Sequence, residues 1–255
     1  QRWNLVLEYR GEQFLAVSKS VRNGANASLE NEIVLLGKRL VLNPSLRSEH
    51  IFNNLAGSPA LSLHPVSGKI GIKYLPVKEW SWFALKGNFS RSYRVPNFTE
   101  LFGGQGSLIG NPNLKPENGL NGDAGIVLNF NKIPRIELSW FRNEIDDLIQ
   151  FLQTSQFTVQ ARNLSQAQIQ GVETSFTLPL FDRIDLSGNY TYQRAKDTSG
   201  LPGVDGNFLP GRPIHEASGR LSLRNRWGRL FGDLHFLDSN YLDTQNILRI
   251  NHRVL

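Results

Sequence analysis

The residues best suited to chemistry gather around the stretch RVPNFTELFGGQGSLIGNPNLKPE, residues 94–117, which lies between two predicted strands. Arg91 and Arg94 can direct positive charge toward an anionic ligand, and the ring of Tyr93 can stack on one. Asn97 offers a side-chain amide nearby. These four residues are therefore candidate ligand contacts on a long loop.

A structural role is the alternative for the same loop. Arg94, Asn97 and Glu100 are equally suited to tying it to its neighbours through ion pairs and hydrogen bonds. Proline fixes φ, glycine permits unusual turns, and asparagine favours turns, so the composition predicts a loop of defined shape. The residues that we expect to shape it are Pro96, Asn111, Pro112 and Asn113.

Histidine and cysteine usage limits the other kinds of site. The five histidines are His50, His64, His215, His235 and His252. His64 and His215 fall in or beside predicted outer loops, where they can touch a ligand, and no histidine spacing is typical of a zinc site. With 0 Cys, thiolate metal sites, disulfides and cysteine nucleophiles are excluded. No pair of carboxylates stands out for catalysis, so we expect no catalytic residue, no metal site and no cofactor.

The formal net charge is +6, from 28 Lys and Arg against 22 Asp and Glu. The basic residues are scattered, with no run of five or six. Such a balance suits a solvated surface, anionic lipid or an anionic ligand. No motif of a nucleic-acid-binding protein accompanies the charge, so nucleic acid is not an expected partner.

Alternation of apolar and polar residues dominates the chain and predicts an all-β protein. In IDLSGNYTYQ, residues 184–193, every second residue is apolar or glycine up to Tyr192. No window approaches 18 consecutive apolar residues, as a transmembrane helix requires. We predict about twelve strands, with a thirteenth starting near Ile247. Their ranges are 3–9, 13–20, 30–36, 39–49, 67–75, 81–91, 119–130, 135–145, 167–178, 184–194, 215–225 and 229–238.

The predicted connections alternate between short and long. Short turns are expected at 9–13, 36–38, 75–80, 131–135, 179–183 and 224–229, and long loops near 50–66, 92–118, 146–166 and 195–214. In an antiparallel up-and-down barrel, this order puts all short turns at one rim and all long loops at the other. Strict alternation of short and long connections indicates a transmembrane β-barrel of the outer-membrane type, since the connections of a soluble sandwich do not require such alternation.

Several motifs then occur in an order that resembles the barrel of TonB-dependent outer-membrane receptors. They are SRSYRVPNFTELFG followed by GNPNLKPE, FRNEIDDLIQF (141–151), ARNLSQAQIQGVE (161–173), YTYQRAKD (190–197) and LPGRPIHEASGRL (209–221). The resemblance implies a structural role for Gly171, as a close backbone approach, and for Glu173, as a carboxylate of the lumen. It covers most of the chain.

The resemblance implies a plugged barrel of 22 strands, of which this chain supplies an incomplete, mid-to-late segment. We expect residues 1–255 to be barrel throughout, with the plug and the N-terminal box that contacts TonB absent from them. The expected location is the bacterial outer membrane, among lipid and lipopolysaccharide.

The function that the resemblance implies is TonB-energised uptake of a metal chelate such as a ferric siderophore or cobalamin. Some haem receptors of the family carry a histidine between two similar boxes, whereas residues 97–110 contain none, which disfavours haem. A passive porin-like barrel is the first alternative. A soluble β-rich binding protein or glycosidase is the second.

Overall fold

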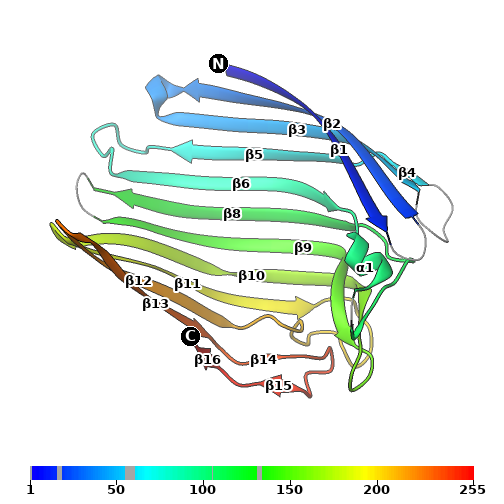
Figure 1. The fold of residues 1–255 in the computed structure, drawn as a ribbon. Helices are drawn as coiled ribbons and strands as arrows, with labels where there is room; N and C mark the ends of the chain where they lie inside the picture. The colour runs from blue at the N-terminus through cyan, green and yellow to red at the C-terminus, as the bar shows by residue number, and fades with distance from the viewer. Residues whose placement is uncertain (1, 16–18, 55–60, 105, 131–133) are drawn as a thin grey trace.

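The computed structural model describes residues 2–15, 19–54, 61–104, 106–130 and 134–255. In them one long sheet curves around a hollow without closing on itself (Figure 1). Its strand order is β1-β2-β3-β5-β6-β8-β9-β10-β11-β12-β13-β16, and each neighbouring pair is antiparallel. The prediction of an all-β, antiparallel, up-and-down barrel segment of about twelve to thirteen strands is confirmed.

The long strands are β1 (Arg2–Leu15), β2 (Lys19–Leu35), β3 (Leu40–Asn54), β5 (Val66–Tyr74), β6 (Phe83–Arg94), β8 (Glu117–Asn129), β9 (Arg135–Gln153), β10 (Val159–Phe181), β11 (Ile184–Asp197), β12 (His215–Asn225) and β13 (Gly228–Leu237). The short elements are η1 (Leu36–Lys38), β4 (Leu61–Leu63), α1 (Phe98–Phe102), β7 (Leu108–Ile109), β14 (Asn240–Tyr241), β15 (Arg249–Ile250) and β16 (Arg253–Val254). Among the described residues, no helix is long and apolar enough to cross a membrane.

The two rims of the sheet differ as the alternation of connections predicts. One rim carries tight turns, such as the two residues between β10 and β11. The other carries α1, β4 and the long connections at residues 95–116, 198–214 and 238–248 (Figure 1). Part of three predicted connections, residues 55–60, 105 and 131–133, lies outside the described residues.

The prediction of strands at 3–9 and 13–20 joined by a turn at 9–13 is wrong. β1 runs through that turn without a break, and Gly11 pairs with Asn23 in a continuous register with β2. Cross-strand pairing overrides the local preference of a single glycine for a turn. Of the predicted second strand, residues 16–18 lie outside the described part of the chain.

The predicted long loop at 146–166 is also wrong, because β9 and β10 leave only residues 154–158 between them. Pairs such as Ile149–Asn163 continue the ladder through this polar sequence. Alternation is weak there because polar side chains occupy both faces. The thirteenth strand expected near Ile247 reduces to the two-residue β15.

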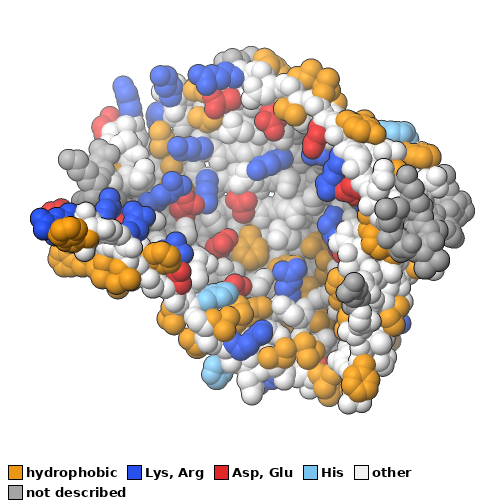
Figure 2. Space-filling model, viewed as in Figure 1, with side chains coloured by type: hydrophobic (Ala, Val, Ile, Leu, Met, Phe, Trp, Pro, Cys, Tyr) orange, Lys and Arg blue, Asp and Glu red, His pale blue; other side chains and the backbone are white. Residues whose placement is uncertain are grey.

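Side chains alternate between the two faces of the sheet. The convex face is apolar and open to the surroundings, with exposures of 43% for Leu138 and 48% for Trp140. The concave face is charged: Figure 2 looks into the hollow and shows Lys, Arg, Asp and Glu side chains gathered there. The pair formed by Lys86 Nζ and Glu137 Oε2, at 2.7 Å, lies on this face. An apolar outside and a polar inside are typical of a membrane barrel.

Candidate functional site

The loop from residue 95 to 116 is folded, and α1 is its centre. A capping box begins this helix: Glu100 N donates to Asn97 Oδ1 at 2.8 Å, and Asn97 N donates to Glu100 Oε2 at 2.7 Å. Two of the N–H groups that a helix start leaves without partners are thereby satisfied. Asn97 and Glu100, both singled out from the sequence, thus hold each other.

Arg94 joins this helix to the sheet. At the end of β6, its guanidinium donates to both carboxylate oxygens of Glu117, at 2.8 and 2.5 Å, and to both of Glu100, at 3.0 Å. Glu117 also accepts from the backbone N of Ile149 at 2.7 Å. A planar guanidinium suits such two-sided binding of carboxylates. The contacts of Arg94 are those of a structural clamp.

The NPNL segment closes the loop onto β10. Asn111 Nδ2 donates to the backbone oxygen of Ala161 at 3.1 Å, and Asn111 Oδ1 accepts from Asn113 N at 3.1 Å in a turn around Pro112. The backbone N of Asn111 donates to Glu100 O at 2.9 Å. The segment is thereby joined both to β10 and to α1.

The interior of the loop is apolar and tightly packed. Leu101 of α1 forms one buried cluster with Leu114, Ile149 and Ala161. Gly110 passes so close to α1 that a Cβ there would overlap the backbone of Phe102. Glycine is required at this approach because any side chain would separate the two segments.

A second anchor ties the loop to the first two strands. Pro96 O accepts a hydrogen bond of 2.8 Å from Arg22, whose guanidinium also lies 5.1 Å from the ring centre of Phe98. Phe102 stacks on Phe14 with ring centres 5.4 Å apart. Strands far from the loop in sequence therefore fix its position above the concave face.

Gly171 and Glu173 lie farther down β10. A Cβ at Gly171 would overlap the backbone oxygen of Tyr192 and come within 3.0 Å of Phe141 Cζ. Glu173 lines a hollow on the concave face together with Lys86 and other polar residues. Gly171 thus lies where two backbones approach closely and Glu173 lies on the concave face, and the structural role of both residues stays a prediction.

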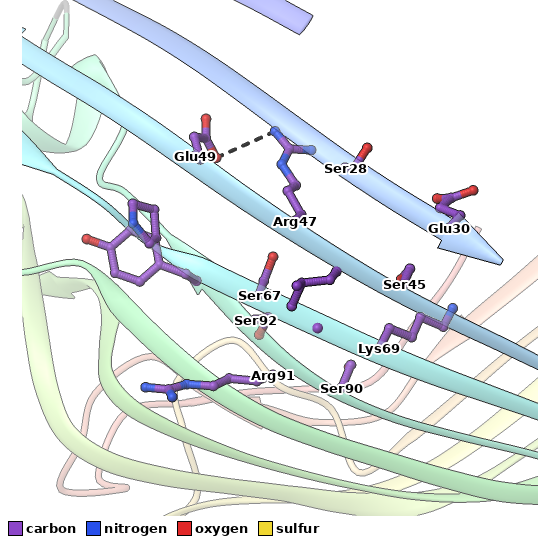
Figure 3. A pocket seen from close by; sticks show the side chains of 14 residues that line it. Ser28, Glu30, Ser45, Arg47, Glu49, Ser67, Lys69, Ser90, Arg91 and Ser92 are labelled. Carbon is purple, nitrogen blue, oxygen red and sulfur yellow. Dashed lines mark hydrogen bonds and ion pairs between the residues drawn. The ribbon is translucent and has the colours of Figure 1, made fainter. Parts of the chain in front are cut away.

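A polar cavity of about 430 Å³ opens across β2, β3, β5 and β6 (Figure 3). Its hydroxyl groups come from Ser28, Ser45, Ser67, Ser90 and Ser92. Its charged residues on the same face are Arg47, 3.5 Å from Glu49 Oε2, Lys69 and the carboxylates Glu30 and Glu49. Among the residues that the structure describes, Lys69 has no ion-pair partner. Several hydroxyl donors and a free ammonium can bind an anionic, oxygen-rich molecule.

Four of the predicted ligand contacts do not project onto the serine-lined face of this cavity. Arg91 and Tyr93 border the cavity, but they alternate with its serines along β6 and so project from the convex side. His215 Nδ1 lies 2.7 Å from the hydroxyl oxygen of Tyr190 on the convex side, and His64 contacts His50. Ligand contact by these residues, and by Arg94 and Asn97, stays a prediction.

Sequence reasoning missed the cavity residues Arg47 and Lys69 and the clamp residue Glu117. Ser45 pairs directly with Lys69, and Arg47 with Ser67, so register brings the cations together. The sequence of a single strand does not show that Arg47 and Lys69 are neighbours, because their proximity depends on how β3 and β5 align. The sequence contains one signal for Glu117, which is the last residue of the GNPNLKPE motif.

The comparisons with known proteins agree with this architecture. Residues 7–251 match the family model described as TonB dependent receptor-like, beta-barrel. The chain is 27% identical over 150 residues to the iron-regulated outer membrane virulence protein of Vibrio cholerae serotype O1, covering 52% of this chain and 22% of that protein. It is 23% identical over 218 residues to the heme/hemopexin utilization protein C of Haemophilus influenzae, covering 74% and 30% respectively.

Solved structures show the same fold. The copper transporter OprC superposes with a TM-score of 0.69 at 17% identity, over 93% of this chain and 39% of that one. A ferric enterobactin receptor mutant from Pseudomonas aeruginosa, in complex with enterobactin, gives 0.66 at 19% identity, over 93% and 37%. The chain spans less than a third of each of the two curated relatives above. With 245 of its residues, 7 to 251, matching the barrel model, the chain belongs to the family of TonB-dependent outer-membrane receptors.

Proposed function

We propose that residues 1–255 form part of the wall and outer loops of a receptor that takes up a metal chelate across the outer membrane, energised through TonB. Relatives carry names that refer to iron regulation, heme, ferric enterobactin and vitamin B12. Uptake of this kind consists of binding and conformational change, with no bond broken. A ferric siderophore is the favoured ligand and cobalamin the second.

The proposal places the plug and the TonB contact in parts of the receptor outside this chain. The charged concave face is suited to packing against such a polar domain, since a dry core does not hold that many ions. The convex face is suited to lipid, and the rim above it to lipopolysaccharide. The long-loop rim is then the outer one and the tight turns face the periplasm.

The cavity on the concave face is the observation that carries the choice of ligand. Arg47 and Lys69 lie next to a row of serine hydroxyls, and the carboxylates Glu30 and Glu49 line the same cavity. Lys69, which has no ion-pair partner among the described residues, and the hydroxyl groups are therefore the donors open to an anionic ligand. Siderophores hold iron through oxygen atoms and are often anionic, so they match a lining of hydroxyl groups and an ammonium group without an ion-pair partner. The loop at 95–116, which Arg94 clamps, lies at the long-loop rim.

The proposal extends to the residues predicted from the sequence. Arg91, Tyr93, His64 and His215 are proposed as contacts for a ligand approaching the outer surface, because they lie near the ends of β6, β4 and β12 at the long-loop rim. Arg94 and Asn97 are proposed to act by holding the loop in shape. The hydrogen bonds of Arg94 to Glu100 and Glu117, and the bond from Glu100 N to Asn97, support this structural role.

A binding experiment tests the choice of ligand. The complete receptor, purified in detergent, is titrated with a ferric catecholate, and the double variant Arg47→Gln with Lys69→Gln is compared with the wild type. We expect about tenfold weaker binding, equivalent to roughly 1.4 kcal/mol for the lost charge-assisted contacts.

The matched control is Lys38→Gln with Arg226→Gln, which removes the same charge from the tight-turn rim. If both double variants weaken binding equally, the effect is one of net charge and the cavity does not recognise the chelate. If neither changes binding, the cavity is not the ligand site.

A further inference from the structure

His50 and His64 meet on the convex side near the long-loop rim. Their Nδ1 atoms are 3.0 Å apart, whereas their ring centres are 4.3 Å apart with the ring planes inclined by 59°. The two nitrogens are therefore the converging ends of the rings. Both residues are exposed to the surroundings.

The backbone holds the two histidines opposite each other. β3 and β4 pair in the register Ile51–Leu63, and Glu49 N donates to Pro65 O at 3.0 Å on the other side of His50 and His64. Residues directly opposite in an antiparallel pair have Cβ atoms about 4.5–5.5 Å apart. The pair is thus placed by the ladder and needs no loop rearrangement to converge.

The separation of the nitrogens fits a shared metal ion. A nitrogen ligand lies about 2.0–2.1 Å from Zn²⁺, so two such ligands at roughly 90–109° around one ion are about 2.8–3.4 Å apart. The observed 3.0 Å falls within this range. Imidazole is a ligand that copper, nickel and zinc accept, and water can fill the remaining positions of an exposed ion.

We propose that His50 and His64 form a two-histidine site for a borderline divalent cation, with Cu²⁺ bound more tightly than Ni²⁺ or Zn²⁺. The order follows the general ranking of these ions for nitrogen ligands. Each imidazole must present an unprotonated Nδ1, so the ion replaces the proton that otherwise joins the two nitrogens. Bound there, it links β3 to β4 at the rim.

The other histidines do not offer this arrangement. His215 meets Tyr190, His235 Nε2 lies 3.1 Å from Glu216 Oε1, and the ring of His252 packs near Phe236. Within the described part of the chain, His50 and His64 are the histidines whose ring nitrogens meet each other. A hydrogen bond between two exposed imidazoles adds little stability, because each can bond to water instead.

The site is tested with the complete receptor in detergent and with Cu²⁺ alone as the probe. Calorimetry gives the number and affinity of sites, and electron paramagnetic resonance reports nitrogen ligands of the bound ion. His50→Gln and His64→Gln are each expected to abolish one site or to weaken it by about tenfold or more, since chelation needs both rings. Zn²⁺ should compete for the site.

His252→Gln is the control, because it removes an exposed histidine without touching the pair. Migration on unboiled gels verifies that every variant is folded. The proposal is overturned if either His50→Gln or His64→Gln binds Cu²⁺ as the wild type does. It is equally overturned if His252→Gln causes the same loss, which would show unspecific surface binding.

Discussion

Arg94 is the residue on which the shape of the outer loop depends most. Its guanidinium contacts two carboxylates at once, Glu100 on α1 and Glu117 on β8. Lysine keeps the charge but cannot bind both carboxylates in this way. We expect Arg94→Lys to expose the loop, with chymotrypsin cutting at Phe98 or Phe102 about tenfold faster, since losing a hydrogen bond between charged groups costs about 1.5–3 kcal/mol.

Arg142→Lys is the matched control for this measurement. Arg142 pairs with Glu144 two positions along the same strand, and both side chains are about half exposed. Such surface pairs contribute little to stability. Equal cleavage rates for the two variants in the complete receptor would contradict the role of Arg94 as a clamp.

At the scale of the elements, the pairing of β10 with β11 depends on Gly171. A Cβ at this position would overlap the backbone oxygen of Tyr192, whereas a Cβ at Gly232 in β13 meets no heavy atom within 4 Å. We expect Gly171→Ala to lower the temperature at which the folded form disappears on unboiled gels by several degrees, since overpacking costs about 1–3 kcal/mol. Gly232→Ala should melt like the wild type; an equal shift in both variants would refute the close approach.

Across the whole molecule, the convex face is apolar and suited to lipid, whereas the concave face is charged and suited to a polar interior. Leu138 and Ser139 are neighbours on β9 that project to opposite faces. We expect Leu138→Lys to reduce the amount of folded receptor, because a lysine facing lipid costs about 2–4 kcal/mol at the midplane and less near the interface. Ser139→Lys should leave the amount of folded receptor unchanged. If Ser139→Lys reduces this amount and Leu138→Lys does not, the two faces are assigned wrongly.

The sequence predicts the fold best where the two faces differ most. β12 occupies residues 215–225, as alternation predicts, because its side chains alternate between apolar and polar surroundings. For residues 146–166, which belong mostly to β9 and β10, the sequence predicts a loop because polar residues occur on both faces there. Gly11 predicts a turn because the partner with which it pairs lies in another strand.

The candidate site can be predicted only in part, because several of its residues become neighbours only through the pairing of different strands. Asn97 and Glu100 form a capping box whose spacing is visible in the sequence, although α1 itself was not predicted. Arg47 and Lys69 become neighbours only through the register of β3 with β5. Likewise, His50 and His64 converge because β4 folds back on β3.

The measurement that tests the central claim most directly is uptake of radioactive iron, supplied as a ferric siderophore, by cells that carry the complete receptor. Cells with and without TonB are compared, because active transport needs TonB and diffusion through an open barrel does not. If the receptor transports a chelate actively, we expect saturable uptake that disappears without TonB. Uptake that is equal in both kinds of cell and rises in proportion to concentration would contradict active transport and indicate a passive porin.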